Sequence, residues 1–280
     1  MKLRICHLYP DLLNLYGDRG NILALVRRAQ WYGLEVSVVS KGLGESVDPR
    51  EFDLFFIGGG EDRQQRLAAR DLREVKGEAL REAAASGKVI LGVCGGYQLL
   101  GHAYRPAEGE DLEGLGLLDV VTVHPGKAAK RLIGNIVIRC ALLGGRTLVG
   151  FENHGGRTAL GSGVRPLGVV LAGFGNNGED GTEGAVCGNV YGTYLHGPLL
   201  PKNPAFADFL IARALETRYG KVHLRALDDR VEEEAHRAAA ALALRGRPWG
   251  ARVLAKISGR ESVGGKFDPQ GRKAREESKT

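Results

Sequence analysis

A cysteine stands at the end of an apolar run in a pattern that suits nucleophilic chemistry. Val89 to Val93 reads as a strand, and the next residues, Cys94-Gly95-Gly96-Tyr97-Gln98, are expected to open a helix. Small residues around Cys94 permit the sharp turn of a nucleophile elbow, which places the sulfur at the helix N-terminus. The positive end of the helix dipole favours the thiolate, the nucleophilic form. A buried cysteine beside packing glycines is the alternative interpretation of this segment alone.

A second glycine cluster follows another predicted strand. Gly58, Gly59 and Gly60 come directly after the apolar run Leu54 to Ile57, so their amides are expected at the same sheet edge as the cysteine. Attack of a thiolate on an amide carbonyl puts negative charge on the oxygen, which preorganised N–H donors stabilise. We predict an oxyanion hole formed by the backbone N–H groups of Gly95 and Gly59, with Gly60 as the alternative to Gly59. Taken alone, the cluster also fits a plain turn or a phosphate-binding loop.

The chain has seven histidines, and one of them is well placed to act as a general base. His196 follows the apolar run Val190 to Leu195 and precedes Gly197-Pro198, which ends the strand at the sheet edge. From there a base can reach across to the predicted nucleophile. His154 is the main rival, but its glycine-rich context predicts a loop and a role in shaping the site.

The remaining cysteines and the apolar runs exclude several classes of protein. Cys6, Cys140 and Cys187 lack the paired spacing of a zinc site or a disulfide framework, so we expect three small buried residues and no metal site. No stretch approaches the roughly 18 apolar residues of a membrane span. The chain opens into the strand-like Leu3 to Leu8 rather than into a signal peptide. These features predict a cytoplasmic globular protein.

The net charge of +6 at pH 7 is concentrated at one end of the chain. Residues Arg245 to Thr280 contain ten Lys or Arg and four Asp or Glu, which leaves residues 1–244 electrically balanced. This segment is also rich in Gly and Ser and lacks apolar periodicity. We therefore predict a folded domain over residues 1–245, a basic disordered tail over 246–280, and no nucleic-acid partner. Attraction of the tail to an anionic membrane or nucleic acid is the alternative.

Alternating strand-like and helix-like segments predict an α/β fold with a mostly parallel sheet and helices on both faces. After Gly114 the pattern changes to short β segments between glycine-rich turns, which favours an antiparallel portion. The predicted strands are Leu3–Leu8, Glu35–Val39, Leu54–Ile57, Val89–Val93, Leu117–Val123, Asn135–Cys140, Thr147–Phe151, Gly168–Ala172 and Ala185–His196. The predicted helices are Asn21–Trp31, Leu67–Ala85, Ala205–Tyr219 and Arg230–Leu244.

As a set, these motifs resemble the class I glutamine amidotransferases of the cobyric acid synthase type, which have a flavodoxin-like fold. The resemblance rests on the triple glycine, on Gly-x-Cys-Gly-Gly-Tyr-Gln around Cys94, and on Gly-Thr-Tyr-Leu-His-Gly-Pro around His196. Three further segments make the chain similar to the glutaminase subunits of lipid II isoglutaminyl synthases, from residue 1 to residue 245. They are Leu13–Asn21, Gly150–Thr158 and Gly173–Gly178.

The resemblance implies that the chain hydrolyses L-glutamine to glutamate and ammonia without a cofactor of its own. It implies a heterodimer in which ammonia passes to a Mur-ligase-like partner that uses ATP and magnesium. That partner would amidate the α-carboxyl of D-glutamate in the lipid II stem peptide, giving D-isoglutamine for peptidoglycan. The family's substrate-binding arginine corresponds to Arg131, whose guanidinium suits the α-carboxylate of glutamine. Gln98 is expected to help shape the pocket.

One departure concerns the acid that orients the base. Many class I amidotransferases have His-x-Glu, whereas here Pro198 stands two residues after His196. Glu152, another carboxylate brought close by folding, or a carboxylate of the partner are the alternatives, and we expect the isolated chain to be a poor glutaminase. The alternative functions are a glutaminase for another synthetase, such as a cobyrinate-type amidase, a free-standing Cys-His hydrolase, and a non-catalytic binding module.

Overall fold

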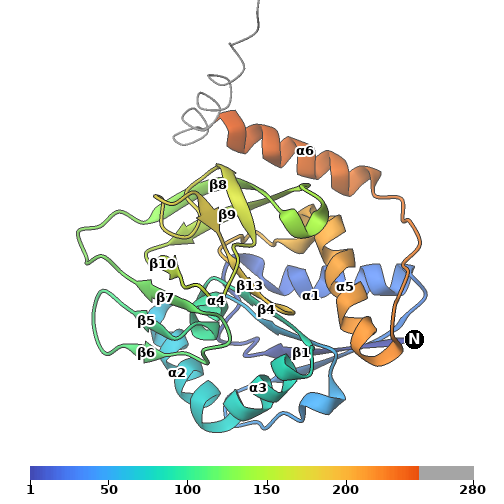
Figure 1. Ribbon diagram of the computed structural model, residues 1–280, viewed down its shortest axis with the longest axis horizontal. Helices are drawn as coiled ribbons and strands as arrows, with labels where there is room; N and C mark the ends of the chain where they lie inside the picture. The colour runs from blue at the N-terminus through green and yellow to red at the C-terminus, as the bar shows by residue number, and fades with distance from the viewer. Residues whose placement is uncertain (246–280) are drawn as a thin grey trace, which may run out of the picture.

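A six-stranded sheet with the order β13-β14-β4-β3-β1-β2 forms the centre of the computed structural model, which describes residues 1–245 (Figure 1). All neighbouring strands are parallel except the antiparallel pair β13 and β14. Both β3 and β4 are buried along their whole length, which explains their continuous apolar sequences. The strands are β1 (Lys2–Leu8), β2 (Glu35–Lys41), β3 (Leu54–Ile57), β4 (Val89–Val93), β13 (Ala185–Cys187) and β14 (Val190–Thr193).

Helices cover both faces of this sheet, as predicted. Figure 1 shows α1 and α5 on one face and α2 and α3 on the other. The predicted helix Leu67–Ala85 begins earlier than expected and is interrupted by a π-helical turn, Leu72–Lys76. The helices are α1 (Arg19–Trp31), α2 (Asp62–Asp71), α3 (Gly77–Ala85), α4 (Gly95–Leu100) and α5 (Pro204–Tyr219).

The predicted antiparallel portion is confirmed, but it lies in two separate four-stranded sheets rather than in an extension of the central sheet. One has the order β10-β7-β5-β6 and the other β12-β11-β8-β9, and all their strand pairs are antiparallel except the parallel pair β5 and β7. Their strands are β5 (Ala103–Arg105), β6 (Leu112–Glu113), β7 (Val120–Val123), β8 (Leu132–Arg139), β9 (Thr147–His154), β10 (Arg157–Leu160), β11 (Gly168–Ala172) and β12 (Thr182–Glu183).

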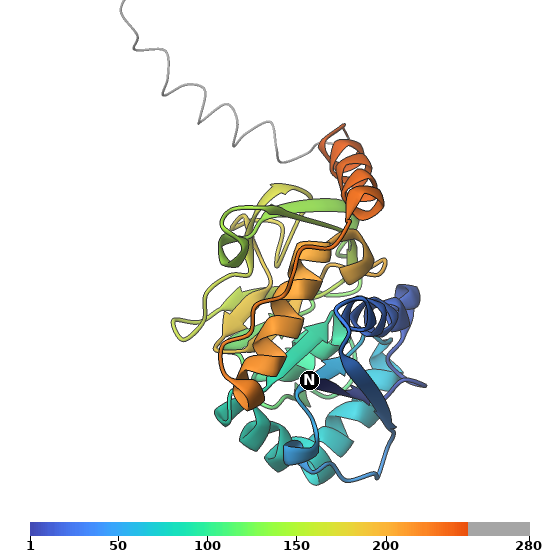
Figure 2. The same cartoon turned by 90° about the vertical axis from the view of Figure 1, so that its right-hand side faces the viewer.

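The last described helix, α6 (Arg230–Arg245), packs on β8, β9 and β11. Figures 1 and 2 show it at the end of the molecule away from α3. No helix among residues 1–245 is long and apolar enough to cross a membrane. The segment 246–280 lies outside the described residues, so the disordered tail stays a prediction.

The predicted strand Ala185–His196 is wrong in its extent. Gly188, with φ 57°, turns the chain between β13 and β14, so the segment is a hairpin. His196 lies beyond β14 and is held instead by two backbone hydrogen bonds to Phe151 of β9, at 2.8 and 3.1 Å. The central sheet and the small sheet that contains β9 thus meet at the predicted base.

Two of the three cysteines expected to be structural are buried, namely Cys6 and Cys140, and burial raises the pKa of each thiol. Cys187 is exposed, contrary to the prediction, because it ends β13 at the edge of the central sheet.

Candidate active site

The elbow predicted around Cys94 is present. β4 ends at Val93 and α4 begins at Gly95, so Cys94 is the single residue of the turn. Its φ of 51° and ψ of −102° lie outside the regions that side-chain-bearing residues normally adopt. Strain of this kind persists only where the surroundings impose it, and Cys94 N donates to Thr193 O of β14 at 2.8 Å. The neighbouring strand therefore fixes the nucleophile's backbone.

The close approach of α4 to β3 depends on Gly96. A Cβ atom on this residue would lie 2.4 Å from the carbonyl oxygen of Ile57, a backbone atom that cannot move aside. We expect Gly96→Ala to lower the free energy of unfolding by about 1–3 kcal/mol, the usual cost of overpacking. The measurement is urea-induced unfolding followed by circular dichroism. Gly134→Ala is the matched control, because its nearest contact is 3.8 Å away, and equal losses in both variants would contradict the packing argument.

His196 lies beside Cys94 and is paired with a carboxylate. Its Nδ1 is 3.3 Å from Oδ1 of Asp18, and both side chains are fully buried. A Cβ placed on Gly59 would lie 2.8 Å from Cε1 of His196 and 3.3 Å from Cβ of Cys94, so the two residues flank this glycine closely. Within residues 1–245, Nε2 of His196 has no hydrogen-bond partner. This nitrogen is therefore available for proton exchange at the site.

The charges around His196 favour its protonated form. Burial lowers the pKa of the imidazole, but the negative charge of Cys94 and the hydrogen bond from His196 to Asp18 outweigh it and raise the pKa to about 10. The ring of His196 therefore holds a proton at pH 7. A proton donor for a leaving group thus lies beside the candidate nucleophile.

The prediction for the oxyanion hole needs a correction. The N–H of Gly59 donates to Oδ2 of Asp18 at 2.7 Å and so is not free to bind an oxyanion. Gly60, the alternative, lines the same pocket as Cys94. Its nitrogen lies 3.1 Å from the position of a Cβ on Gly95, so these two amides are neighbours. Gly60 and Gly95 are the better pair of donors.

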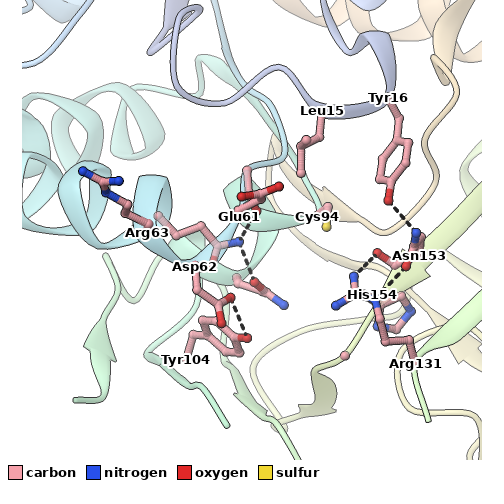
Figure 3. A pocket seen from close by; sticks show the side chains of 14 residues that line it. Leu15, Tyr16, Glu61, Asp62, Arg63, Cys94, Tyr104, Arg131, Asn153 and His154 are labelled. Atoms are coloured by element: carbon pink, nitrogen blue, oxygen red, sulfur yellow. Dashed lines mark hydrogen bonds between the residues drawn. The ribbon is translucent and has the colours of Figure 1, made fainter. Parts of the chain in front are cut away.

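A cavity of about 510 Å³ opens in front of Cys94. Figure 3 shows Glu61, Asp62 and Tyr104 on one side of Cys94, and Asn153 and Arg131 on the other. The structure thus brings the predicted substrate-binding arginine to the nucleophile's pocket. The lining residues are Leu15, Tyr16, Gly60, Glu61, Asp62, Arg63, Gln65, Cys94, Gln98, Tyr104, Arg131, Asn153, His154 and Gly155.

Gln98 forms part of the pocket wall through a buried hydrogen-bond network. Its Nε2 donates to the hydroxyl of Tyr194 at 3.1 Å, and its Oε1 accepts from Nε2 of Gln65 at 3.0 Å. Gln65 also donates to the carbonyl oxygen of Gly60 at 3.1 Å. The network therefore links the helix of the elbow to the glycine cluster, a role for Gln65 that sequence reasoning missed.

Comparison with known proteins agrees with this geometry. Residues 4–204 match the model of the CobB/CobQ-like glutamine amidotransferase domain. The chain belongs to this family. The crystal structure of a glutamine amidotransferase aligns with a TM-score of 0.52 and 17% identity, over 75% of this chain and 98% of that chain, which supports the fold. The class I amidotransferase fold predicted from the motifs is thereby confirmed.

Two relatives of this amidotransferase are similar over most of their length. Both are named lipid II isoglutaminyl synthase (glutamine-hydrolyzing) subunit GatD. The protein from Staphylococcus aureus is 45% identical over 234 residues, 84% of this chain and 93% of the relative. The protein from Streptococcus pneumoniae is 41% identical over 234 residues, 83% of this chain and 88% of the relative.

His154, the alternative candidate for the general base of this amidotransferase, lies in the pocket wall, but its surroundings differ from those of His196. It ends strand β9 rather than standing in a loop, and its ring stacks on Tyr194 at 3.6 Å between centroids. Nδ1 is 2.9 Å from the carbonyl oxygen of Gly156. Burial lowers the pKa of His154, so its imidazole is neutral at pH 7. These contacts suit the site-shaping role expected for it.

Glu152 is not the acid that lies beside His196. Its carboxylate accepts hydrogen bonds from the backbone N–H groups of Phe174 and Gly175, at 2.7 and 2.9 Å. Asp18 occupies the position beside His196 instead, although no motif argument singled it out. The sequence signal that could have identified Asp18 is its position after the first strand, because the carboxyl ends of parallel strands share one edge of the sheet.

Proposed function

We propose that this chain is the glutamine-hydrolysing subunit of a lipid II isoglutaminyl synthase. The observation that carries the proposal is the strained Cys94 elbow, with His196 beside it and Asp18 behind His196. Similarity to the two isoglutaminyl synthase subunits over most of their length supports the choice of pathway.

The first half of the reaction releases ammonia. The Cys94 thiolate attacks the carboxamide carbon of glutamine, and the N–H groups of Gly60 and Gly95 bind the resulting oxyanion. His196 gives its proton to the substrate nitrogen, the carbon–nitrogen bond breaks, and ammonia leaves a γ-glutamyl thioester on Cys94. Asp18 keeps the His196 ring in the required orientation.

The second half regenerates the enzyme. His196, now neutral, takes a proton from water as the water oxygen attacks the thioester carbon. The carbon–sulfur bond breaks, glutamate is released, and Cys94 returns as a thiolate beside protonated His196. Arg131 binds the α-carboxylate of glutamine throughout, because three of its five N–H groups remain after its hydrogen bonds to Asn153. No step needs a cofactor on this chain.

Ammonia needs an activated carboxyl as its acceptor. The proposed partner is a Mur-ligase-like subunit that forms a heterodimer with this chain and uses ATP and magnesium to activate the α-carboxyl of D-glutamate in the lipid II stem peptide. Ammonia displaces the activating group and leaves D-isoglutamine. Both similar relatives are named as subunits of a synthase, which supports a partner for this chain.

The test is nitrogen transfer in the assembled enzyme. We expect the chain, mixed with the Mur-ligase-like partner, ATP and magnesium, to move ¹⁵N from amide-labelled glutamine into the stem peptide, because the released ammonia meets the activated carboxyl. Mass spectrometry of the peptide and enzymatic assay of glutamate measure both products. Ammonium chloride in place of glutamine is the control for the partner's activity.

The outcomes separate the alternative functions. Glutamate formation without labelled peptide, together with amidation of a cobyrinate-type acceptor by another synthetase, would contradict the pathway and retain the glutaminase. Turnover of esters or peptides without any glutamine hydrolysis would identify a free-standing hydrolase instead. Absence of turnover in every mixture would leave a binding module.

A further inference from the structure

Tyr16 has an unusual backbone conformation at the edge of the pocket. With φ 53°, it is one of three non-glycine residues in the left-handed region among residues 1–245, together with Tyr9 and Cys94. Its side chain is 43% exposed, so burial of the ring does not account for the conformation. Backbone strain is concentrated at functional sites, so the contacts of this exposed side chain beside the nucleophile indicate its role.

The ring of Tyr16 covers the general base. Its centroid lies 5.0 Å from that of His196 in an edge-to-face arrangement, and 5.9 Å from the ring of Phe151. His196 is completely buried although its neighbour Cys94 lines an open cavity. The aromatic ring therefore contributes to excluding water from the imidazole.

The hydroxyl of Tyr16 belongs to the part of the site proposed to bind substrate. It accepts a hydrogen bond from Nδ2 of Asn153. Asn153 in turn accepts from Nε of Arg131 at its Oδ1, 2.8 Å away, and from Nη2 at its backbone oxygen, 2.9 Å away. Figure 3 shows Tyr16, Asn153 and Arg131 together on one side of the pocket. One side chain thus touches the base and, through Asn153, fixes the guanidinium.

We propose that Tyr16 is a positioning residue that sets Arg131 for the α-carboxylate of glutamine while its ring shields His196. The proposal rests on the proposed function, in which Arg131 binds that carboxylate. It assigns separate tasks to two parts of one side chain. The hydroxyl acts on substrate binding, and the ring acts on the base.

Tyr16→Phe removes the hydroxyl and keeps the ring. We expect the KM for glutamine to rise about three- to tenfold, the effect of one hydrogen bond, with kcat within about twofold of wild type. In an Arg131→Ala background the same change should leave KM unaltered, because the residue on which the hydroxyl acts is gone. The measurement is steady-state glutaminase kinetics of the full chain with its partner for wild type, both single variants and the double variant.

Tyr219→Phe is the matched control. Tyr219 is 42% exposed, and its hydroxyl is bonded to the backbone of Lys2, away from the pocket, so KM and kcat should both stay within about twofold of wild type. Tyr16→Ala, which also removes the ring, should lower kcat in addition to raising KM.

The outcomes distinguish this proposal from the proposed function. Glutamine hydrolysis by wild type and a raised KM in Arg131→Ala test the proposed function and the binding of the α-carboxylate by Arg131, without any change at Tyr16. With both in place, an unchanged KM in Tyr16→Phe, or an equal rise in KM with and without Arg131, overturns the role of Tyr16. A substrate analogue that lacks the α-carboxylate should show no difference between wild type and Tyr16→Phe, and a full difference there would also overturn it.

Discussion

Cys94→Ala is expected to abolish glutamine hydrolysis, with kcat reduced by at least about 10⁴-fold, the range seen when a covalent nucleophile is removed. Without the sulfur no γ-glutamyl thioester forms, and His196 has no thiol with which to exchange a proton. The measurement is glutamate release by the variant and by wild type under saturating glutamine. Thermal unfolding by circular dichroism verifies that the variant folds.

Cys187→Ala is the control, because this exposed cysteine lies outside the pocket and its loss should leave kcat within about twofold of wild type. A covalent glutamine analogue should modify Cys94 alone in the wild-type chain. Modification that persists at another cysteine of Cys94→Ala, or residual activity of a tenth of wild type, would contradict the assignment of the nucleophile.

Asp18→Asn is expected to reduce kcat by about 10²–10⁴-fold in the chain without its partner. Loss of the orienting carboxylate in a well-studied serine protease triad costs the upper figure, because the base then adopts the wrong tautomer. Here the asparagine would replace the carboxylate that contacts Nδ1 of His196 at 3.3 Å. The measurement is kcat of wild type and of Asp18→Asn, each alone and in the complex with the partner.

Two further measurements interpret this result. Asp11→Asn changes an acid of the same loop that does not line the pocket of Cys94 and should leave kcat within about twofold of wild type. If Asp18→Asn is as active as wild type in the complex, a partner carboxylate supplies the acid, one of the alternatives that the His196-Gly197-Pro198 sequence left open. A loss in both states places the acid on this chain.

Local signals predicted much of the fold and the nucleophile. The strand before Cys94, the glycines around it and the helix after it are adjacent in sequence, so their pattern is sufficient to predict the elbow. The apolar runs of β3 and β4 likewise predict buried parallel strands. His196 was identified because an apolar run ends just before it.

The rest of the site depends on contacts that adjacent residues do not specify. Asp18 and His196 are separated by 178 residues, and no periodicity relates them. The choice between Gly59 and Gly60 depends on the same aspartate, because Oδ2 of Asp18 accepts the hydrogen bond of the Gly59 N–H. The single strand predicted over Ala185–His196 failed at Gly188, whose positive φ turns a run that otherwise reads as continuous.

The place of β14 in the central sheet has a consequence for synthesis of the protein. β14 lies between β4 and β13, yet it follows β4 in the chain by almost a hundred residues, so the ribosome completes the β4 elbow long before its neighbour exists. Until Val190–Thr193 emerges, the apolar β4 is an open sheet edge, a template for aggregation. Nascent chains and fragments that end before residue 190 should therefore require chaperones, and they carry the nucleophile without its base.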